Sequence, residues 1–163
     1  MGEVTTSANP GRTQIDEITM GAIGLANADL ARAYLRDVFN AHDPDRCPEY
    51  LAADVTWHGG TLGTVNGLAE VTKVVRGFVT AFPDLRADAC DVVADEDTAV
   101  VRSVVRGTHR GELLGIPPTG HSVRWDAVDI YRIADGRITE IWARDDLVAI
   151  LHQLGEYSAP WLR

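Results

Sequence analysis

The chain changes its hydrophobic period once, from a helical repeat in its first half to strand patterns in its second half. Residues 28–41 and 67–82 carry apolar side chains three and four positions apart, and Pro83 ends the second repeat. The segments that alternate or run apolar afterwards are 85–94, 98–108, 122–134 and 137–143. Helices followed by a meander of strands predict an α+β fold and do not fit a doubly wound one.

Shorter patterns complete the predicted domain. Cys47, Tyr50 and Leu51 predict a short second helix, and residues 55–58 have the β-branched and aromatic character of a strand. Residues 147–154 predict a closing helix with Gly155 as its C-cap.

The domain is expected to begin at Asn27, a suitable N-cap for the first helix. The predicted organisation is a mobile arm at 1–26, a single domain at 27–155 and a tail at 156–163.

Charge and composition exclude several classes of partner. The net charge of -9 and a single lysine, Lys73, leave no basic stripe for nucleic acid or an anionic membrane. No apolar run approaches the roughly 20 residues that span a bilayer, and residues 1–5 do not begin a signal peptide. A cytoplasmic location is therefore expected. Cys47 and Cys90 form neither a disulfide framework nor a zinc motif.

Asp129 is the only carboxylate on an apolar and aromatic strand face. The residues that share this face by alternation are Val123, Trp125, Ala127, Asp129, Tyr131 and Ile133. Burial there would raise the pKa of the carboxyl and suit it to general acid–base catalysis. Two interpretations stay open: a catalytic carboxyl, or a structural one that pairs with an arginine such as Arg102 or Arg132 or caps a neighbouring backbone group.

Two histidines could contribute to the same site. His109 ends a strand of small and apolar residues, and His58 follows Trp57 on the earlier strand. An imidazole at the rim of a pocket can shuttle a proton, but each histidine can equally be a hydrogen-bonded turn residue. No HxH or HExxH motif links them, so no metal site is expected. The chain also lacks GxSxG, GxGxxG and GxxxxGK motifs, and we expect no cofactor.

The segment 142–146 joins an aromatic ring, a guanidinium and two adjacent carboxylates where the last strand ends. Adjacent residues of an extended chain point to opposite faces, so at most one of Asp145 and Asp146 faces a pocket unless the helix has begun. One of the two is expected to cap the closing helix, and a catalytic role needs only the other.

Several short motifs follow one another in a specific order. They are AFPDL at 81–85, GTHRG at 107–111, GIPPTG at 115–120, DIYR at 129–132, DGRITEIW at 135–142 and QLG at 153–155. Together with the first helix they resemble the SnoaL-like ester cyclases of the NTF2-like superfamily, over nearly all of residues 27–155.

This resemblance implies a cone-shaped, strongly curved mixed sheet packed against three N-terminal helices, with a central pocket. It also implies a homo-oligomer, a dimer or tetramer, that associates through the outer face of the sheet. Characterised members close the last ring of anthracycline-type polyketide methyl esters by an intramolecular aldol condensation, without metal or nucleotide. An acidic side chain removes the activated α-proton, and the pocket positions the carbanion against its ketone.

The chain departs from this family at its last strand. Many members have His-Trp where this chain has Ile141-Trp142, and the cyclases place their essential aspartate directly after the tryptophan. This chain has Ala143 at that position. The carboxylate then has to come from Asp129, Asp145 or Asp146.

The leading prediction is a cofactor-independent acid–base enzyme that cyclises a mostly apolar, polyketide-like small molecule. The candidate catalytic residues are Asp129, Asp146, His109 and His58. The candidate substrate-binding residues are Trp57, Tyr34, Trp125, Tyr131, Trp142 and Arg144.

Two alternatives belong to other classes of protein. One is an epoxide-opening hydrolase resembling limonene epoxide hydrolase, in which Asp129, Asp146 and either Arg144 or Arg102 form an Asp-Arg-Asp set that activates water. The other is a non-catalytic small-molecule-binding module on the same fold, which would be favoured if the pocket were filled by its own side chains.

Overall fold

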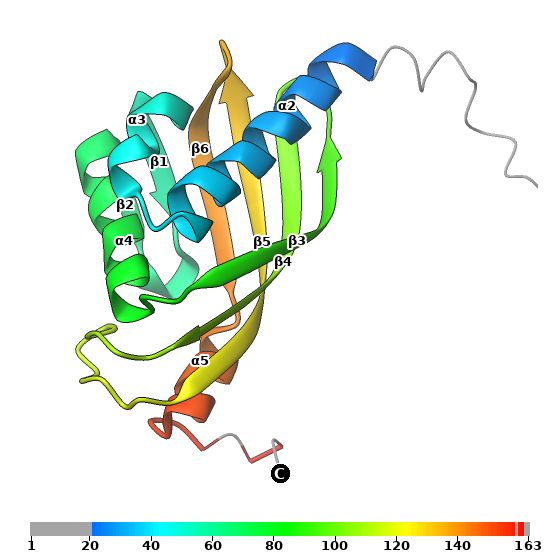
Figure 1. Cartoon of the computed structure of the whole chain (residues 1–163). Helices are drawn as coiled ribbons and strands as arrows, with labels where there is room; N and C mark the ends of the chain where they lie inside the picture. The colour runs from blue at the N-terminus through cyan, green and yellow to red at the C-terminus, as the bar shows by residue number, and fades with distance from the viewer. Residues whose placement is uncertain (1–20, 159, 162–163) are drawn as a thin grey trace, which may run out of the picture.

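The computed structural model describes residues 21–158 and 160–161 (Figure 1). In this part of the chain, six strands form one sheet. They are β1 (Leu51–His58), β2 (Thr64–Asn66), β3 (Arg86–Ala94), β4 (Thr98–Thr108), β5 (Ser122–Ala134) and β6 (Arg137–Asp145). Their order is β2-β1-β6-β5-β4-β3, and β1 runs parallel to β6 whereas the other neighbours are antiparallel. The sheet is therefore mixed, as predicted.

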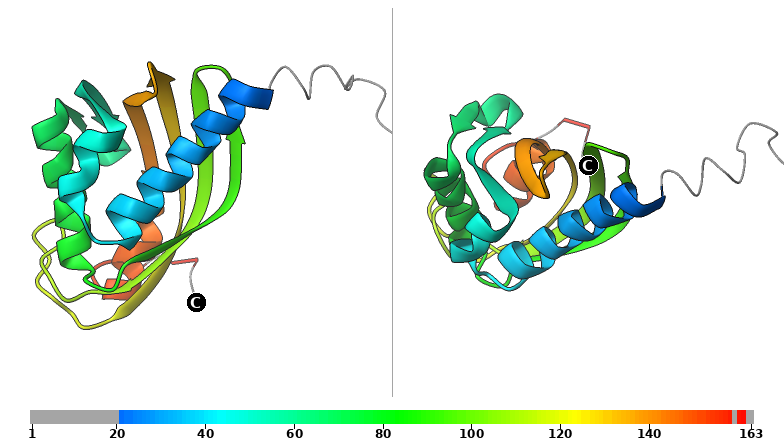
Figure 2. Two further views of the ribbon diagram at one scale, coloured as in Figure 1. Left: turned by 45° about the horizontal axis from the view of Figure 1, so that its top comes forward. Right: turned by 90° about the horizontal axis from the view of Figure 1, so that it is seen from above.

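Helices lie on one face of this sheet and at its lower end. They are α2 (Gly21–Tyr34), η1 (Leu35–Asn40), η2 (Pro44–Arg46), α3 (Cys47–Tyr50), η3 (Gly60–Leu62), α4 (Leu68–Ala81) and α5 (Leu147–Leu154). Figure 1 shows α2, α3 and α4 on the same side of the sheet, and α5 below its lower end. The long strands β3 to β5 curve strongly, as the two views in Figure 2 show. The predicted α+β class, with a curved sheet against N-terminal helices, is confirmed.

The start of the first helix differs from the prediction. Residues 1–20 of the predicted arm lie outside the described residues, but 21–26 belong to α2. Asn27 is therefore not an N-cap. Its buried side-chain amide donates hydrogen bonds to the backbone oxygens of Asp95 (2.8 Å) and Glu96 (3.1 Å). These bonds fasten α2 to the turn between β3 and β4.

The end of the first helix widens into a π-helical turn, η1, where the sequence predicts a continuous helix to Ala41. A wider turn changes the direction of successive side chains. Leu35 and Phe39 of this turn and Tyr34, the last residue of α2, all reach the same cavity. The widened turn thus shapes one wall of the candidate site.

The core lies between the concave face of the sheet and the helices. Along β5, Trp125, Ala127 and Tyr131 are buried and Asp129 on the same face is half-buried, while Asp126, Val128 and Ile130 are exposed, as the alternation predicts. From the opposite side α4 contributes a buried stripe of valines, Val71, Val75 and Val79. Within the described residues, no helix combines the length and the apolar composition that a membrane crossing requires.

Candidate active site

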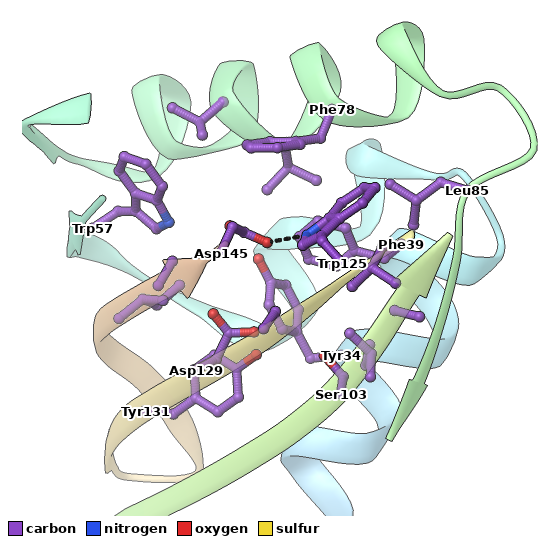
Figure 3. Close-up of a pocket in the computed structure, with 18 residues that line it drawn as sticks. Tyr34, Phe39, Trp57, Phe78, Leu85, Ser103, Trp125, Asp129, Tyr131 and Asp145 are labelled. Atoms are coloured by element: carbon purple, nitrogen blue, oxygen red, sulfur yellow. Dashed lines mark hydrogen bonds between the residues drawn. The ribbon is translucent and has the colours of Figure 1, made fainter. Parts of the chain in front are cut away.

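A cavity lies between the concave face of the sheet and the helices α2, η1 and α4 (Figure 3). Its free volume is about 60 Å³, and the space reaches about 620 Å³ only when the opening to solvent is counted. Its walls are mostly aromatic and aliphatic. The labelled lining residues are Tyr34, Phe39, Trp57, Phe78, Leu85, Ser103, Trp125, Asp129, Tyr131 and Asp145. These side chains leave a small free space that opens to solvent.

Asp129 lies in the middle of β5, half-buried and facing this cavity. Its neighbour across the ladder to β6 is Ala143, and its neighbour in β4 is Val101. Burial raises the pKa of Asp129 to about 7, the charge of Asp145 adds to the rise, and the Tyr131 hydroxyl opposes it. A carboxyl with this pKa exchanges protons near neutral pH.

The two arginines considered as partners of Asp129 are engaged elsewhere. Arg102 donates a hydrogen bond to Asp91 (2.6 Å), and Arg132 donates one to Asp97 (2.7 Å). Among the described residues that line the cavity, none carries a positive charge. The ion-pair interpretation of Asp129 is therefore wrong for both arginines.

Asp145 is the second carboxyl of the cavity. It was among the possible sources of the carboxylate predicted from the sequence but not among the candidate catalytic residues. It shares a face with Ile141 and Ala143 because β6 continues two residues beyond the predicted end of the strand. The indole Nε1–H of Trp125 donates a hydrogen bond to Asp145 Oδ1 (2.7 Å), drawn as a dashed line in Figure 3. Burial raises the pKa of Asp145, and the hydrogen bond from Trp125 opposes this rise.

Hydroxyl groups surround the two carboxyls. Tyr34 comes from α2, Tyr131 from β5 and the buried Ser103 from β4. Burial raises the pKa of both tyrosines, and the charge of Asp129 raises each further. Both phenols therefore stay protonated at neutral pH and can donate hydrogen bonds to a substrate oxygen. Carboxyls that exchange protons, together with such donors, suit enolisation of a carbonyl compound.

The structure brings some of the predicted site residues together and separates the others. Asp129, Trp57, Tyr34, Trp125 and Tyr131 all line the cavity.

The predicted residues His58 and Trp142 lie together on the opposite face of the sheet. Their rings stack with centroids 5.2 Å apart, and His58 Nε2 lies 2.8 Å from a carboxylate oxygen of Glu140. Trp142 alternates with Ile141 and Ala143, which face the cavity, so its ring points away from it. Neither His58 nor Trp142 is a cavity residue.

His109 is fully buried but belongs to the loop between β4 and β5. Its Nδ1 accepts a hydrogen bond from the backbone N–H of Thr119 (3.2 Å), and its ring packs against Phe82. Burial lowers the pKa of His109, so its ring is neutral. In this position it fastens the 109–121 loop and does not line the cavity.

Asp146 and Arg144 hold the end of β6 in place. Asp146 is the N-cap of α5, where its carboxylate accepts a hydrogen bond from the Ala149 backbone N–H (3.0 Å). Arg144 donates to the backbone oxygens of His58 (2.9 Å) and Ala143 (2.7 Å). Because Arg144 and Arg102 point away from Asp129, the predicted Asp-Arg-Asp set is not assembled.

A second hollow adjoins the cavity at the end of β6. It contains about 780 Å³ of open space and shares Trp57, Ala143 and Asp145 with the cavity. Its other walls come from residues 59–62 and 144–148. Gly59 lies so close to the Trp57 ring that any side chain there would collide with it. The loop and the indole thus define the boundary between the two spaces.

No group of three or more His, Cys, Asp or Glu side chains in the described part of the chain is arranged to hold a metal ion. The reactive groups of the cavity are carboxyls and hydroxyls.

Comparison with known proteins identifies the family. The family model described as SnoaL-like polyketide cyclase matches residues 28–154. The chain belongs to this family. Among its curated relatives is the nogalonic acid methyl ester cyclase of Streptomyces nogalater, 32% identical over 76% of this chain and 91% of the relative.

One further relative and one solved structure are similar to this chain. The aklanonic acid methyl ester cyclase DauD of Streptomyces sp. (strain C5) is 29% identical over 82% of this chain and 72% of the relative. A SnoaL-like protein from Jannaschia sp. CCS1 has the same fold, with a TM-score of 0.78 at 21% identity over 85% of this chain and 97% of the other. The named relatives support the prediction of an enzyme with cyclase activity.

Proposed function

We propose that this SnoaL-like protein cyclises a polyketide-like ester by an intramolecular aldol reaction, without a cofactor, and that Asp129 is its general base. The observation that carries this proposal is a carboxyl with a pKa of about 7 in an aromatic cavity whose described lining residues include no cation. A base whose pKa lies near the working pH is ionised in a large fraction of the molecules and still binds a proton strongly.

The reaction needs one proton to be moved and one carbon–carbon bond to form. Asp129 takes the α-proton of the substrate and becomes a carboxylic acid. The hydroxyls of Tyr34 and Tyr131 donate hydrogen bonds to the enolate oxygen. The α-carbon then attacks the ketone carbon, and the new alkoxide receives the proton from Asp129. The product has the mass of the substrate, and the carboxylate is regenerated.

The apolar walls supply the folded shape that this ring closure requires. Tyr34 and Phe39 meet edge to face with ring centroids 5.6 Å apart, and Phe78 faces the sheet from α4 (Figure 3). Such a surface binds an aromatic or aliphatic chain and excludes water. Binding holds the two reacting carbons close together, so the entropy of bringing them together is lost on binding and does not add to the activation barrier.

The names of the relatives provide substrates for the test. The protein is incubated with aklanonic acid methyl ester or nogalonic acid methyl ester, and the products are separated by liquid chromatography with mass detection. The expected product is an isomer of the substrate, with the same mass and a changed retention time. Asp129→Asn should reduce its formation by at least about 100-fold.

Asp126→Asn is the matched control because Asp126 is exposed on the other face of β5. It should retain wild-type turnover. An isomer formed equally fast by Asp129→Asn and wild type would refute a role for Asp129 as base.

We also propose that the protein is a homo-oligomer that associates through the outer face of the sheet. Val128 and Ile130 are apolar and 37% exposed on the outer face of β5. Light scattering after gel filtration should give a multiple of 17.7 kDa for the wild type. Ile130→Lys should shift the mass toward the monomer, and a monomeric wild type would contradict this proposal.

A further inference from the structure

The two carboxyls of the cavity occupy neighbouring positions but have different partners. Asp145 lies directly across from Ala127, and the next cavity-facing residues of β5 are Trp125 on one side and Asp129 on the other. Such diagonal neighbours are about 7–8 Å apart at their Cα atoms, within reach of side chains. The small Ala127 leaves the space between them open.

Trp125 interacts with only one of the two carboxyls. Its indole N–H donates to Asp145 Oδ1 at 2.7 Å, and no such bond is formed with Asp129. An indole can donate a hydrogen bond but cannot accept one at nitrogen. Because a carboxylate is a stronger acceptor than a protonated carboxyl, this bond stabilises the ionised form of Asp145 more than its protonated form.

We propose that Trp125 is a positioning residue that keeps Asp145 as the ionised member of a two-carboxyl pair and leaves the exchangeable proton on Asp129. The asymmetry comes from one hydrogen bond between β5 and β6. Because two close carboxylates repel each other, fixing one charge favours a proton on its neighbour.

The other groups around the pair do not provide a competing charge. The titratable side chains facing it are Tyr34 from α2 and Tyr131 from β5, with Cys47 of α3 behind Tyr34. The remaining described side chains of the cavity wall from η1, α4, β1, β3 and β4 are not ionisable. The order of ionisation therefore depends on the two carboxyls themselves and on their hydrogen-bond donors, Trp125 for Asp145 and the Tyr131 hydroxyl for Asp129.

This division of roles deepens the proposed function and rests on it where it concerns the reaction. Asp145 keeps its charge throughout the cycle, whereas Asp129 accepts the α-proton and returns it to the alkoxide. The order of ionisation itself needs no substrate, so it can be measured independently of cyclase activity.

The test is a pH titration of the side-chain carboxyl carbons by NMR in ¹³C-labelled protein. Asp129→Asn and Asp145→Asn assign the two signals. In the wild type, Asp145 should ionise at lower pH than Asp129. In Asp145→Asn, the midpoint of Asp129 should fall by about one pH unit or more, because the neighbouring charge is gone.

Trp125→Phe tests the positioning role. It removes the indole N–H while keeping an aromatic ring, so the Asp145 curve should move to higher pH and the separation of the two curves should shrink by about one pH unit. Trp57→Phe is the control, because it alters another cavity-lining tryptophan that has no hydrogen bond to either carboxyl. It should leave the separation unchanged.

Two results would overturn the inference. One is an equal separation in Trp125→Phe and wild type, and the other is an Asp129 midpoint that stays in place in Asp145→Asn. If Trp125→Phe does not fold, as judged from its amide spectrum, the Asp145→Asn titration decides alone. Titrations that behave as expected without any ester being cyclised would uphold the pair and refute the proposed function.

Discussion

The Asp129→Asn variant should gain stability relative to the wild type as the pH rises. The pKa of this carboxyl is about 7 in the folded state, against an ordinary value of 3.8. Between these values the folded state binds more protons than the unfolded state, so the free energy of unfolding falls as pH increases. The loss begins near pH 4, is complete above pH 7, and amounts to about 4 kcal/mol. An asparagine at position 129 cannot ionise, so the Asp129→Asn variant does not lose this stability as the pH rises.

Urea unfolding of both proteins at about pH 5 and about pH 8 measures the effect. The stability of Asp129→Asn relative to wild type should increase by about 2.5 kcal/mol between these two pH values. This is a large fraction of the usual 5–15 kcal/mol of a domain. Asp126→Asn, changed on the exposed side of the same strand, should show little such dependence. A relative stability of Asp129→Asn that does not vary with pH would refute the burial argument.

Three other substitutions test the surroundings of the cavity. Gly59→Ala should destabilise the fold by about 1–3 kcal/mol and weaken substrate binding, because the new methyl group collides with the Trp57 ring. Unchanged tryptophan fluorescence and unchanged stability would contradict this. Asn27→Ala should cost about 1–3 kcal/mol in urea unfolding, because it leaves two backbone oxygens without their donor; faster amide exchange should appear in α2 and the β3–β4 turn, and uniform protection would argue against it. Asp146→Ala should lower stability by about 1 kcal/mol through loss of the α5 cap while the turnover rate stays at the wild-type value; a large drop in turnover without a loss of stability would return Asp146 to the chemistry.

Periodicity predicted the fold where an element is long enough to repeat. The alternation along residues 122–134 identified both faces of β5, and the apolar stripe at 67–82 identified α4. The strand β2 has only the three residues Thr64–Asn66, too few for a pattern to appear. The predicted helix start was wrong because asparagine is a common N-cap residue. The Asn27 side-chain amide instead donates a hydrogen bond to a turn 68 residues away, a contact that no local pattern reveals.

The candidate site was predictable only where a strand face defined it. Trp125, Asp129 and Tyr131 follow from one alternation, and all line the cavity. Asp145 could have been found in the same way, by continuing the Ile141, Ala143 alternation by one more step. The predicted strand ended at Ala143, and the choice fell on the neighbouring acid, which caps α5.

Ala143, where the family resemblance implies an essential aspartate, lies beside two acids in the cavity. Ala143 and Asp129 are directly opposed in the ladder between β6 and β5, and both face the same space. Ala143 of β6 therefore has an acid, Asp129, across the ladder on β5, and a second acid, Asp145, occupies the next cavity-facing position along β6. Each of these acids is costly to bury, and neither has a cation beside it among the described cavity residues. The same burial that lowers stability by about 4 kcal/mol above pH 7 raises the proton affinity of Asp129 about 1000-fold. The destabilising feature of the core and the strength of the proposed base are therefore one property of the sheet, and a substitution that relieves the first should remove the second.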